Sequence, residues 1–200
     1  MSNLILSTAY FPPVPWLQSA LQCESAIIDI HEHYIKQTIR NRCTIITANG
    51  LMNLVIPVEK YHNHTPVADI RIDYATDWQR VHGHAIRSAY GKSAFFEFYG
   101  EDLLSIYETQ PEYLTEWNDM CLSAINSMLK LKLEVQASGQ YIEPNDSIDL
   151  RSSKFEVVQS GKPLYTQVFM ERHGFLNGLS VVDLLFCCGP ESREILLRPM

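Results

Sequence analysis

The sequence contains no long apolar run, no cysteine pair of the CxxC type and no glycine-rich phosphate loop. Because no stretch of about 18 uncharged apolar residues occurs, we expect no transmembrane helix. The five cysteines are scattered among apolar neighbours, which favours small buried side chains over a zinc site of thiolates. Residues 1–16 lack the basic segment of a secretory signal. Reduced cysteines without such a signal predict a cytoplasmic protein.

Acidic residues are also missing from one long segment, between Glu32 and Glu59. Within it Lys36, Arg40 and Arg42 lie close together, although the formal net charge of the chain is −7. The negative total argues against general nucleic-acid binding, which requires a basic surface. The sequence therefore gathers cations in one place without local counter-charges, and these residues are the first candidates for a site.

The length of 200 residues suits one domain over residues 1–200, and 46% hydrophobic residues supply a core without disulfides or metals. A short apolar run at 4–9 precedes a proline-rich turn, a helix near 14–23 and a buried strand at 26–30. This β–turn–α–β opening is typical of parallel sheets, whose ligands commonly lie at the strand ends. We therefore expect a mixed α/β fold with a central mixed sheet.

The remaining elements follow from turn signals and apolar periodicity. Asn49-Gly50 predicts a β-hairpin near 42–57, as part of the central sheet. Periodic apolar residues predict helices near 76–91 and 111–133 that pack on the sheet. Further elements are a short strand at 70–74, an irregular loop over 134–160, a helix capped by Ser180, and a short final helix after Gly189-Pro190.

The cationic segment alternates in character when it is written as an extended chain. One face holds Tyr34, Lys36, Thr38, Arg40, Arg42 and Thr44, and the other holds Ile35, Gln37, Ile39, Asn41, Cys43 and Ile45. Two guanidinium groups side by side can bind phosphate or carboxylate bidentately, so the first interpretation is an anion site. Two alternatives stay open: a solvated edge strand protected by its charges, or arginines that pair with Asp29 or Asp73.

Histidines occur in three His-x-His pairs, His31/His33, His62/His64 and His82/His84. No carboxylate stands at a convincing third position, so no metal site is expected. His82 lies on the apolar stripe of the predicted helix 76–91, where a polar ring needs a hydrogen-bond partner. It is either a core histidine or a general acid/base that reaches a pocket beside the cationic segment.

Several blocks together resemble the WbqC-like protein family, in its Bacteroidetes branch. They are YFPPVPW at 10–16, K-Q-x-x-R-N-R-C at 36–43, a hairpin ending in I-P-V, W-x-x-x-H at 78–82 and GLSVVDLLFCCGPES at 178–192. The resemblance covers the chain except for residues 134–170. It places emphasis on Tyr10, Pro12, Lys36, Gln37, Arg40, Asn41, Arg42, Pro57, Trp78, His82, Tyr90 and Asp183. Many relatives are expected to carry His-x-Pro where this chain has Tyr10-Phe11-Pro12.

The resemblance implies a role in surface-polysaccharide (O-antigen-type) precursor metabolism, with a nucleotide or sugar nucleotide as ligand. Under one hypothesis the chain is a transferase, for example of acyl or aminoacyl groups. Lys36, Arg40 and Arg42 would then hold phosphates, with Tyr10, Gln37 and Asn41 at the ligand and His82 as base. Under the other it is a non-catalytic binding protein for an anionic ligand or partner, since no G-x-S-x-G or Cys–His pairing is present. Neither hypothesis names a cofactor. Both place the cations and His82 in one pocket.

Overall fold

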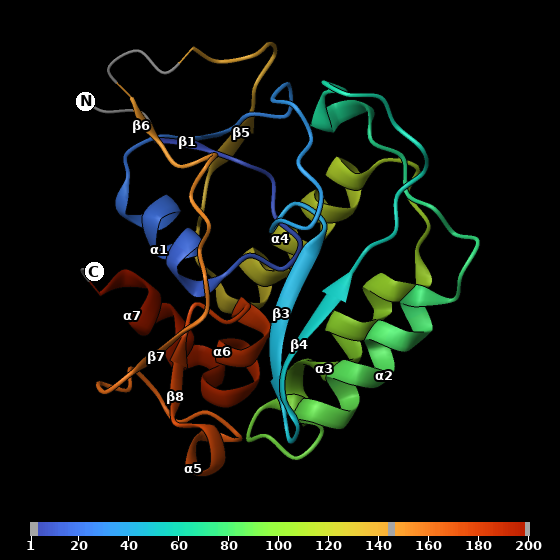
Figure 1. Ribbon diagram of the computed structural model, residues 1–200. Coiled ribbons are helices and arrows are strands. Elements are labelled where there is room, and N and C mark those ends of the chain that lie inside the picture. The colour runs from blue at the N-terminus through green and yellow to red at the C-terminus, as the bar shows by residue number, and fades with distance from the viewer. Residues whose placement is uncertain (1–3, 144–146, 199–200) are drawn as a thin grey trace.

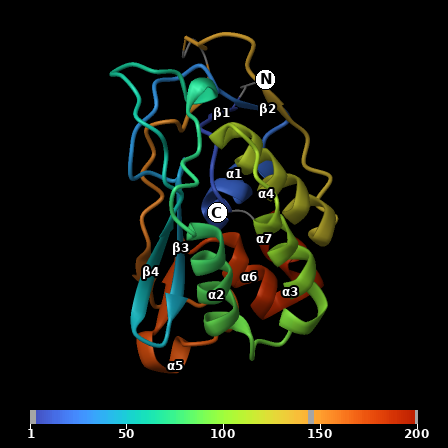
Figure 2. The same ribbon diagram turned by 90° about the vertical axis from the view of Figure 1, so that its right-hand side faces the viewer.

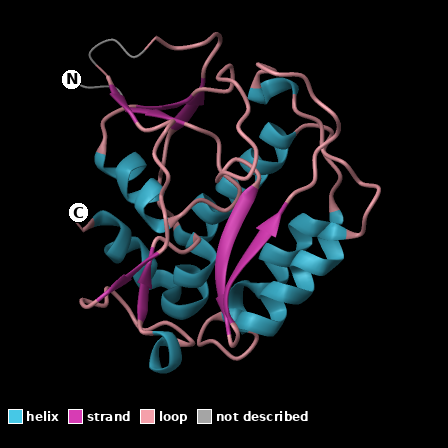
Figure 3. Cartoon of the chain, in the orientation of Figure 1, coloured by secondary structure: helices cyan, strands magenta, loops and turns pink. Residues whose placement is uncertain are grey.

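A computed structural model describes residues 4–143 and 147–198 and has the expected mixed α/β architecture (Figure 1). Four strands form a parallel sheet in the order β5-β2-β1-β6. They are β1 (Leu4–Leu6), β2 (Ala26–Ile28), β5 (Val135–Ala137) and β6 (Ile148–Asp149). The sheet lies at one end of the molecule, and most helices lie at the other (Figure 3).

The first strand and helix form the expected β–α–β unit. All three residues of β1 are buried, as is typical of a parallel strand covered on both faces. The turn after β1 contains Phe11 in the left-handed region, at φ 39°. Helix α1 (Val14–Gln22) then begins with a proline in its first turn, where a missing N–H costs nothing. Its direction returns the chain to β2, parallel to β1.

The expected hairpin is present, but it forms a two-stranded sheet of its own and does not join the parallel sheet. Strands β3 (Arg42–Thr47) and β4 (Gly50–Val55) pair antiparallel, with Ala48 and Asn49 in the turn and Gly50 opposite Thr47. Gly50 has φ 109°, a conformation that glycine adopts without strain. Helices on both sides contact β3, so the hairpin is held between α2 and α6 (Figure 1).

The helices cover the hairpin and close the core beneath the parallel sheet (Figure 2). They are α2 (Trp78–Tyr90), α3 (Phe96–Ser105), α4 (Leu114–Leu129), α5 (Met170–His173), α6 (Val181–Cys188) and α7 (Ser192–Leu197). The short 3₁₀ turn η1 (Val67–Asp69) lies between β4 and α2, whereas η2 (Ile106–Glu108) and η3 (Gly189–Glu191) connect helices. The Ser180 hydroxyl accepts from the Val182 N–H, which confirms the expected cap of α6. Among the described residues, no helix is both long and apolar enough to cross a bilayer.

Two expectations about strands are wrong. The segment 134–160 was expected to be irregular, yet it supplies β5, β6 and the strand β7 (Val158–Ser160), which pairs with β8 (Phe175–Asn177). These strands have at most three residues and mostly exposed side chains, too little for a periodic signal. Residues 144–146 of that segment lie outside the described residues. Residues 70–74, all described, pair through isolated bridges only.

Candidate functional site

The cationic segment is a series of turns up to Asn41 and becomes a strand at Arg42. The Asn41 N–H donates to the Thr38 carbonyl at 3.2 Å, and Gln37 has φ 60°. The predicted alternation over residues 34–41 is therefore wrong, because these turns break the two-residue period. From Arg42 onward it is correct. Cys43 is buried in the core, and Arg42 faces outward.

The outward face of the hairpin forms one wall of an open cleft of about 640 Å³, named here the Arg42 cleft. Its polar lining includes Gln37, Thr38, Arg42, Thr44, Asn53 and Lys154. Its apolar lining includes Phe11, Pro13, Ile39, Leu51 and Phe155. Thr44 and Asn53 face each other across the two strands, with the Thr44 hydroxyl donating to Asn53 Oδ1 at 2.8 Å. The cleft thus combines cations and amides with an apolar surface, as ligand sites commonly do.

Arg42 lines this cleft without an ion pair to any described residue. Its Nε is buried and has no hydrogen-bond partner among the described residues. A buried polar group without a partner is unfavourable, so a bound acceptor at this position is stabilised. Lys154 lies on the other side of the cleft with an exposed ammonium 4.0 Å from Glu156.

Arg40 also lines the cleft, but its guanidinium is occupied by protein groups. Its Nε donates to Glu32 Oε1 at 2.9 Å, Nη1 donates to the Thr38 hydroxyl at 3.1 Å, and Nη2 donates to the Arg151 carbonyl at 3.0 Å. Both partners of the ion pair are buried. Burial raises the pKa of Glu32 although its hydrogen bonds with Arg40 lower it. Arg40 therefore forms the floor of the cleft, with its donors directed to protein acceptors.

Of the other predicted ligand residues of this segment, Gln37 lines the cleft and the remaining two do not. Gln37 is exposed and lines the cleft, whereas Lys36 is exposed and is not among the described lining residues. Asn41 is buried and donates through Nδ2 to the Ile56 carbonyl at 3.0 Å. Its Oδ1 has no partner among the described residues. The structure thus brings Gln37, Arg40 and Arg42 to the cleft and turns Asn41 toward the hairpin base.

Tyr10 and His82 meet in the core and not in the cleft. Tyr10 Oη lies 3.0 Å from His82 Nδ1 and also hydrogen-bonds the Tyr107 hydroxyl. Burial lowers the pKa of His82 to about 4, so the imidazole is neutral at neutral pH. His82 is not among the described residues that line the Arg42 cleft. The expected pocket between the cations and helix α2 is therefore replaced by a packed aromatic cluster, connected to the cleft through Phe11.

Asp183, another residue emphasised by the resemblance, lies fully buried in α6. Its Oδ2 accepts from the Tyr165 hydroxyl at 2.7 Å, and its Oδ1 has no hydrogen-bond partner within the described chain. No described cation forms an ion pair with it. Burial raises the pKa of Asp183 to about 6.

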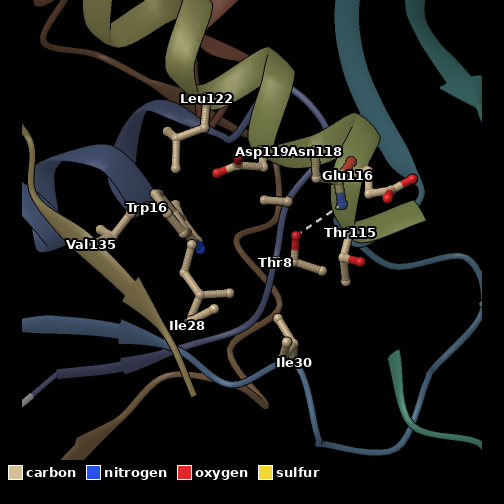
Figure 4. A pocket seen from close by; sticks show the side chains of 12 residues that line it. Thr8, Trp16, Ile28, Ile30, Thr115, Glu116, Asn118, Asp119, Leu122 and Val135 are labelled. Carbon is tan, nitrogen blue, oxygen red and sulfur yellow. Dashed lines mark hydrogen bonds between the residues drawn. The ribbon is translucent and has the colours of Figure 1, made fainter. Parts of the chain in front are cut away.

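A second cavity, the strand-end cavity, lies where β1, β2 and β5 end, against the first turns of α4 (Figure 4). It has a volume of about 250 Å³ and is lined by residues that include Thr8, Trp16, Ile28, Asn118, Asp119 and Val135. None of these was singled out from the sequence. The available signal was the β–α–β opening, because such strands place ligands at their carboxyl ends. The two cavities lie on either side of Arg40, whose carbonyl accepts from Asn118 Nδ2 at 2.8 Å.

The two histidines that approach each other in the structure do not belong to the same His-x-His pair of the sequence. His33 and His64, which come from different pairs, approach each other with their Nδ1 atoms 3.2 Å apart. Within residues 4–143 and 147–198, no group of three or more histidine, cysteine, aspartate or glutamate side chains is arranged to hold a metal ion.

The structure is that of an α/β protein with a cleft that is partly lined by cations, and comparison places the chain in a family. The model of the WbqC-like protein family matches residues 8–153. "Uncharacterized protein Rv1507c" of Mycobacterium tuberculosis is 31% identical over 142 residues, which cover 70% of this chain and 58% of that protein. The chain thus aligns with less than two thirds of that relative's length. No solved structure matches. The chain belongs to the WbqC-like protein family.

The matched range includes residues 134–153, where no motif had suggested the resemblance, and ends before residues 178–192. It contains Gln37, Arg40 and Arg42 as well as the described lining of the strand-end cavity. The far wall of the Arg42 cleft, from Lys154 onward, lies outside it.

Proposed function

We propose that the Arg42 cleft binds the phosphate end of a phosphorylated or nucleotide-activated sugar, and that the protein serves surface-polysaccharide precursor metabolism. The observation that carries the proposal is Arg42, a cleft-lining cation whose Nε is buried and has no described partner. A phosphate oxygen would accept from this donor, and a guanidinium suits phosphate geometry. Gln37 also lines the cleft and adds a neutral donor, whereas the Thr38 hydroxyl already donates to the Ile35 carbonyl at 2.7 Å.

Family membership supports the substrate class, because the resemblance implies polysaccharide precursors. The apolar side of the cleft, with the exposed side chains of Ile35 and Leu51, suits the less polar face of a sugar or an acyl group. Lys36 is exposed and two residues from Thr38. We assign to it long-range attraction of the anion and not direct contact.

Two observations favour the alternative, a non-catalytic binding protein for an anionic ligand. Burial raises the pKa of the cleft-lining Cys43 to about 12, so its thiol is protonated and a poor nucleophile. His82, the proposed base, is held by Tyr10 in the core. As an enzyme the protein would therefore depend on positioning and electrostatic stabilisation, with acyl or aminoacyl transfer as the candidate reaction.

Binding is tested with inorganic pyrophosphate, nucleoside diphosphates and nucleoside diphosphate sugars in a thermal-shift screen followed by calorimetry. A specific ligand raises the melting temperature by mass action. We expect Arg42→Ala to weaken pyrophosphate binding by about tenfold or more, as for a lost charged hydrogen bond. Lys162→Ala is the matched control, since Lys162 is an exposed cation outside the cleft lining. Equal binding by both variants would contradict the proposal.

Once a substrate binds, His82→Gln separates the two functions. Lost turnover with retained binding and an unchanged melting temperature supports catalysis through His82. Retained turnover assigns His82 to the core alone. If His82→Gln loses both ligand binding and thermal stability, His82 has a structural role, because the substitution also disturbs its hydrogen bond with Tyr10.

A further inference from the structure

We propose that the strand-end cavity binds a nucleoside, with the base between its aliphatic walls and the ribose hydroxyls at its carboxylate rim. The cavity lies at the carboxyl ends of β1, β2 and β5, where parallel sheets commonly bind ligands (Figure 4). It shares no described lining residue with the Arg42 cleft. The inference extends the proposed function but does not depend on it.

The walls of the cavity are apolar and come from several elements. Ile28 and Val135 project from neighbouring strands, and Leu122 faces them from α4 (Figure 4). The Trp16 ring closes one side, held in place by its indole N–H, which donates to the Ser7 carbonyl at 3.1 Å. These side chains form a slot for a flat ring, because burying a ring between aliphatic and aromatic groups is favourable on both faces.

The polar atoms at the cavity are mainly acceptors. Glu116 and Asp119 are exposed at the rim, and the described lining contains no lysine or arginine. Asn118 is 2% exposed, and its Oδ1 has no partner among the described residues. A ligand must therefore donate hydrogen bonds, and two carboxylates repel a phosphate.

Two hydrogen bonds of the Asn118 side chain determine which of its amide atoms remains available to a ligand. Asn118 Nδ2 donates to the Arg40 carbonyl at 2.8 Å and to Thr8 Oγ1 at 3.1 Å, so the amide orientation is set. The amide oxygen is left to accept an exocyclic amine or ring N–H of a base. Thr8 Oγ1, as an acceptor, keeps its own proton to donate. The pair thus offers one donor and one acceptor.

Size and polarity favour a nucleoside over a free sugar. A volume of about 250 Å³ is smaller than a typical site for a whole cofactor, so it holds one ring and leaves further atoms at the rim. A sugar placed between these walls would lose water from its hydroxyls without replacement partners, which is costly. A base carries its polar atoms on the ring edge, and the ribose hydroxyls then meet Glu116 and Asp119.

The test uses nucleosides without phosphate, namely adenosine, guanosine, cytidine, uridine and 5-methyluridine, in calorimetry and thermal shift. We expect at least one to bind the full chain and raise its melting temperature. Ala137→Leu fills the cavity and abolishes binding. Gln136→Leu, the adjacent residue of β5 whose side chain points to the opposite face, leaves binding within about twofold.

Two further measurements keep the inference falsifiable if Ala137→Leu does not fold. Asp119→Ala should weaken ribonucleoside binding by roughly tenfold, since it removes a carboxylate acceptor. Thymidine differs from 5-methyluridine by the missing 2′-hydroxyl. It should bind the unmodified protein more weakly than 5-methyluridine does, but the two should bind the Asp119→Ala variant equally. Arg42→Ala should change none of these affinities, which separates this result from failure of the phosphate proposal.

The inference is overturned if no ribonucleoside binds, or if Ala137→Leu and Gln136→Leu reduce binding equally. Binding of glucosamine or methyl glucoside at this cavity, with no nucleoside bound, overturns it in favour of a sugar site.

Discussion

The Arg42 cleft is lined by several cations and amides and one described carboxylate, Glu156, whereas the strand-end cavity is lined by aliphatic side chains with carboxylates and no described cations at its rim. One residue separates them: the Arg40 side chain closes the floor of the cleft, and its carbonyl binds Asn118 beside the cavity. Two arginines two positions apart thus have different roles, because Arg40 meets a buried Glu32 and Arg42 meets no described acid. Charge near a site becomes available to a ligand only when the protein leaves it unpaired.

The largest effect on stability is expected for Arg40, which lies between the two cavities. Arg40→Ala leaves Glu32 buried without its cation and should lower the free energy of unfolding by about 3–5 kcal/mol. Arg42→Ala should change it by less than about 0.5 kcal/mol, as for a partly exposed side chain outside a network. Denaturant unfolding measures both. Similar losses in the two variants would erase the distinction between the arginines.

A double replacement sharpens this result. Glu32→Leu combined with Arg40→Met removes both charges and should recover most of the stability, since buried pairs are often replaced by apolar residues at little cost. A double variant as unstable as Arg40→Ala would show that the hydrogen bonds of Arg40 to Thr38 and the Arg151 carbonyl dominate.

The next largest effect on stability is expected for Asp183. It is a buried acid like Glu32, but it has no ion pair with a described cation. Its folded pKa of about 6 lies above the ordinary 3.8, so the folded state binds the proton more tightly. This contribution to stability is fully present below pH 3.8 and is lost as the pH rises through 6. Relative to Asp183→Asn, the original protein should lose roughly 2.4 kcal/mol of unfolding free energy between pH 4 and pH 7, at 1.36 kcal/mol per pKa unit. A difference that stays constant with pH would refute the raised pKa.

Salt should change ligand affinity differently at the two cavities, although the effect is smaller than those of the substitutions above. Raising sodium chloride from about 0.05 to 0.5 M screens exposed charges and should weaken pyrophosphate binding several-fold. Nucleoside binding, which depends on apolar contact and hydrogen bonds, should change by less than about twofold. Calorimetry at both salt concentrations measures the two responses, and equal salt dependence would indicate one common site.

The smallest effect is expected at Lys36. Lys36→Gln should reduce pyrophosphate affinity by less than about twofold at 0.15 M salt, because a solvated ammonium outside the lining acts only through a screened field. A loss as large as that of Arg42→Ala would place Lys36 in direct contact with the ligand.

The sequence predicts those features that depend on neighbouring residues. Asn49-Gly50 specifies the hairpin, and Ser180 specifies the start of α6, because turns and caps are local. It does not predict that Arg40 pairs with Glu32, since the alternation at 34–41 indicates an extended chain where the structure has turns. The strand-end cavity is equally hidden, because β5 supplies Val135 to a wall begun by Thr8, and strands of two or three residues are too short to recognise.

The strand order of the parallel sheet also has a kinetic consequence. Leu4 pairs with Ile148, so an edge of the sheet joins residues from distant parts of the chain. Closing such a loop costs entropy before any contact is gained, and chains with many distant pairings fold slowly. We therefore expect the β3–β4 hairpin and helix α2 to gain hydrogen-exchange protection early in refolding. Strand β6, and with it the ion pair of Arg151 with Asp29 that anchors the following loop, should be protected last.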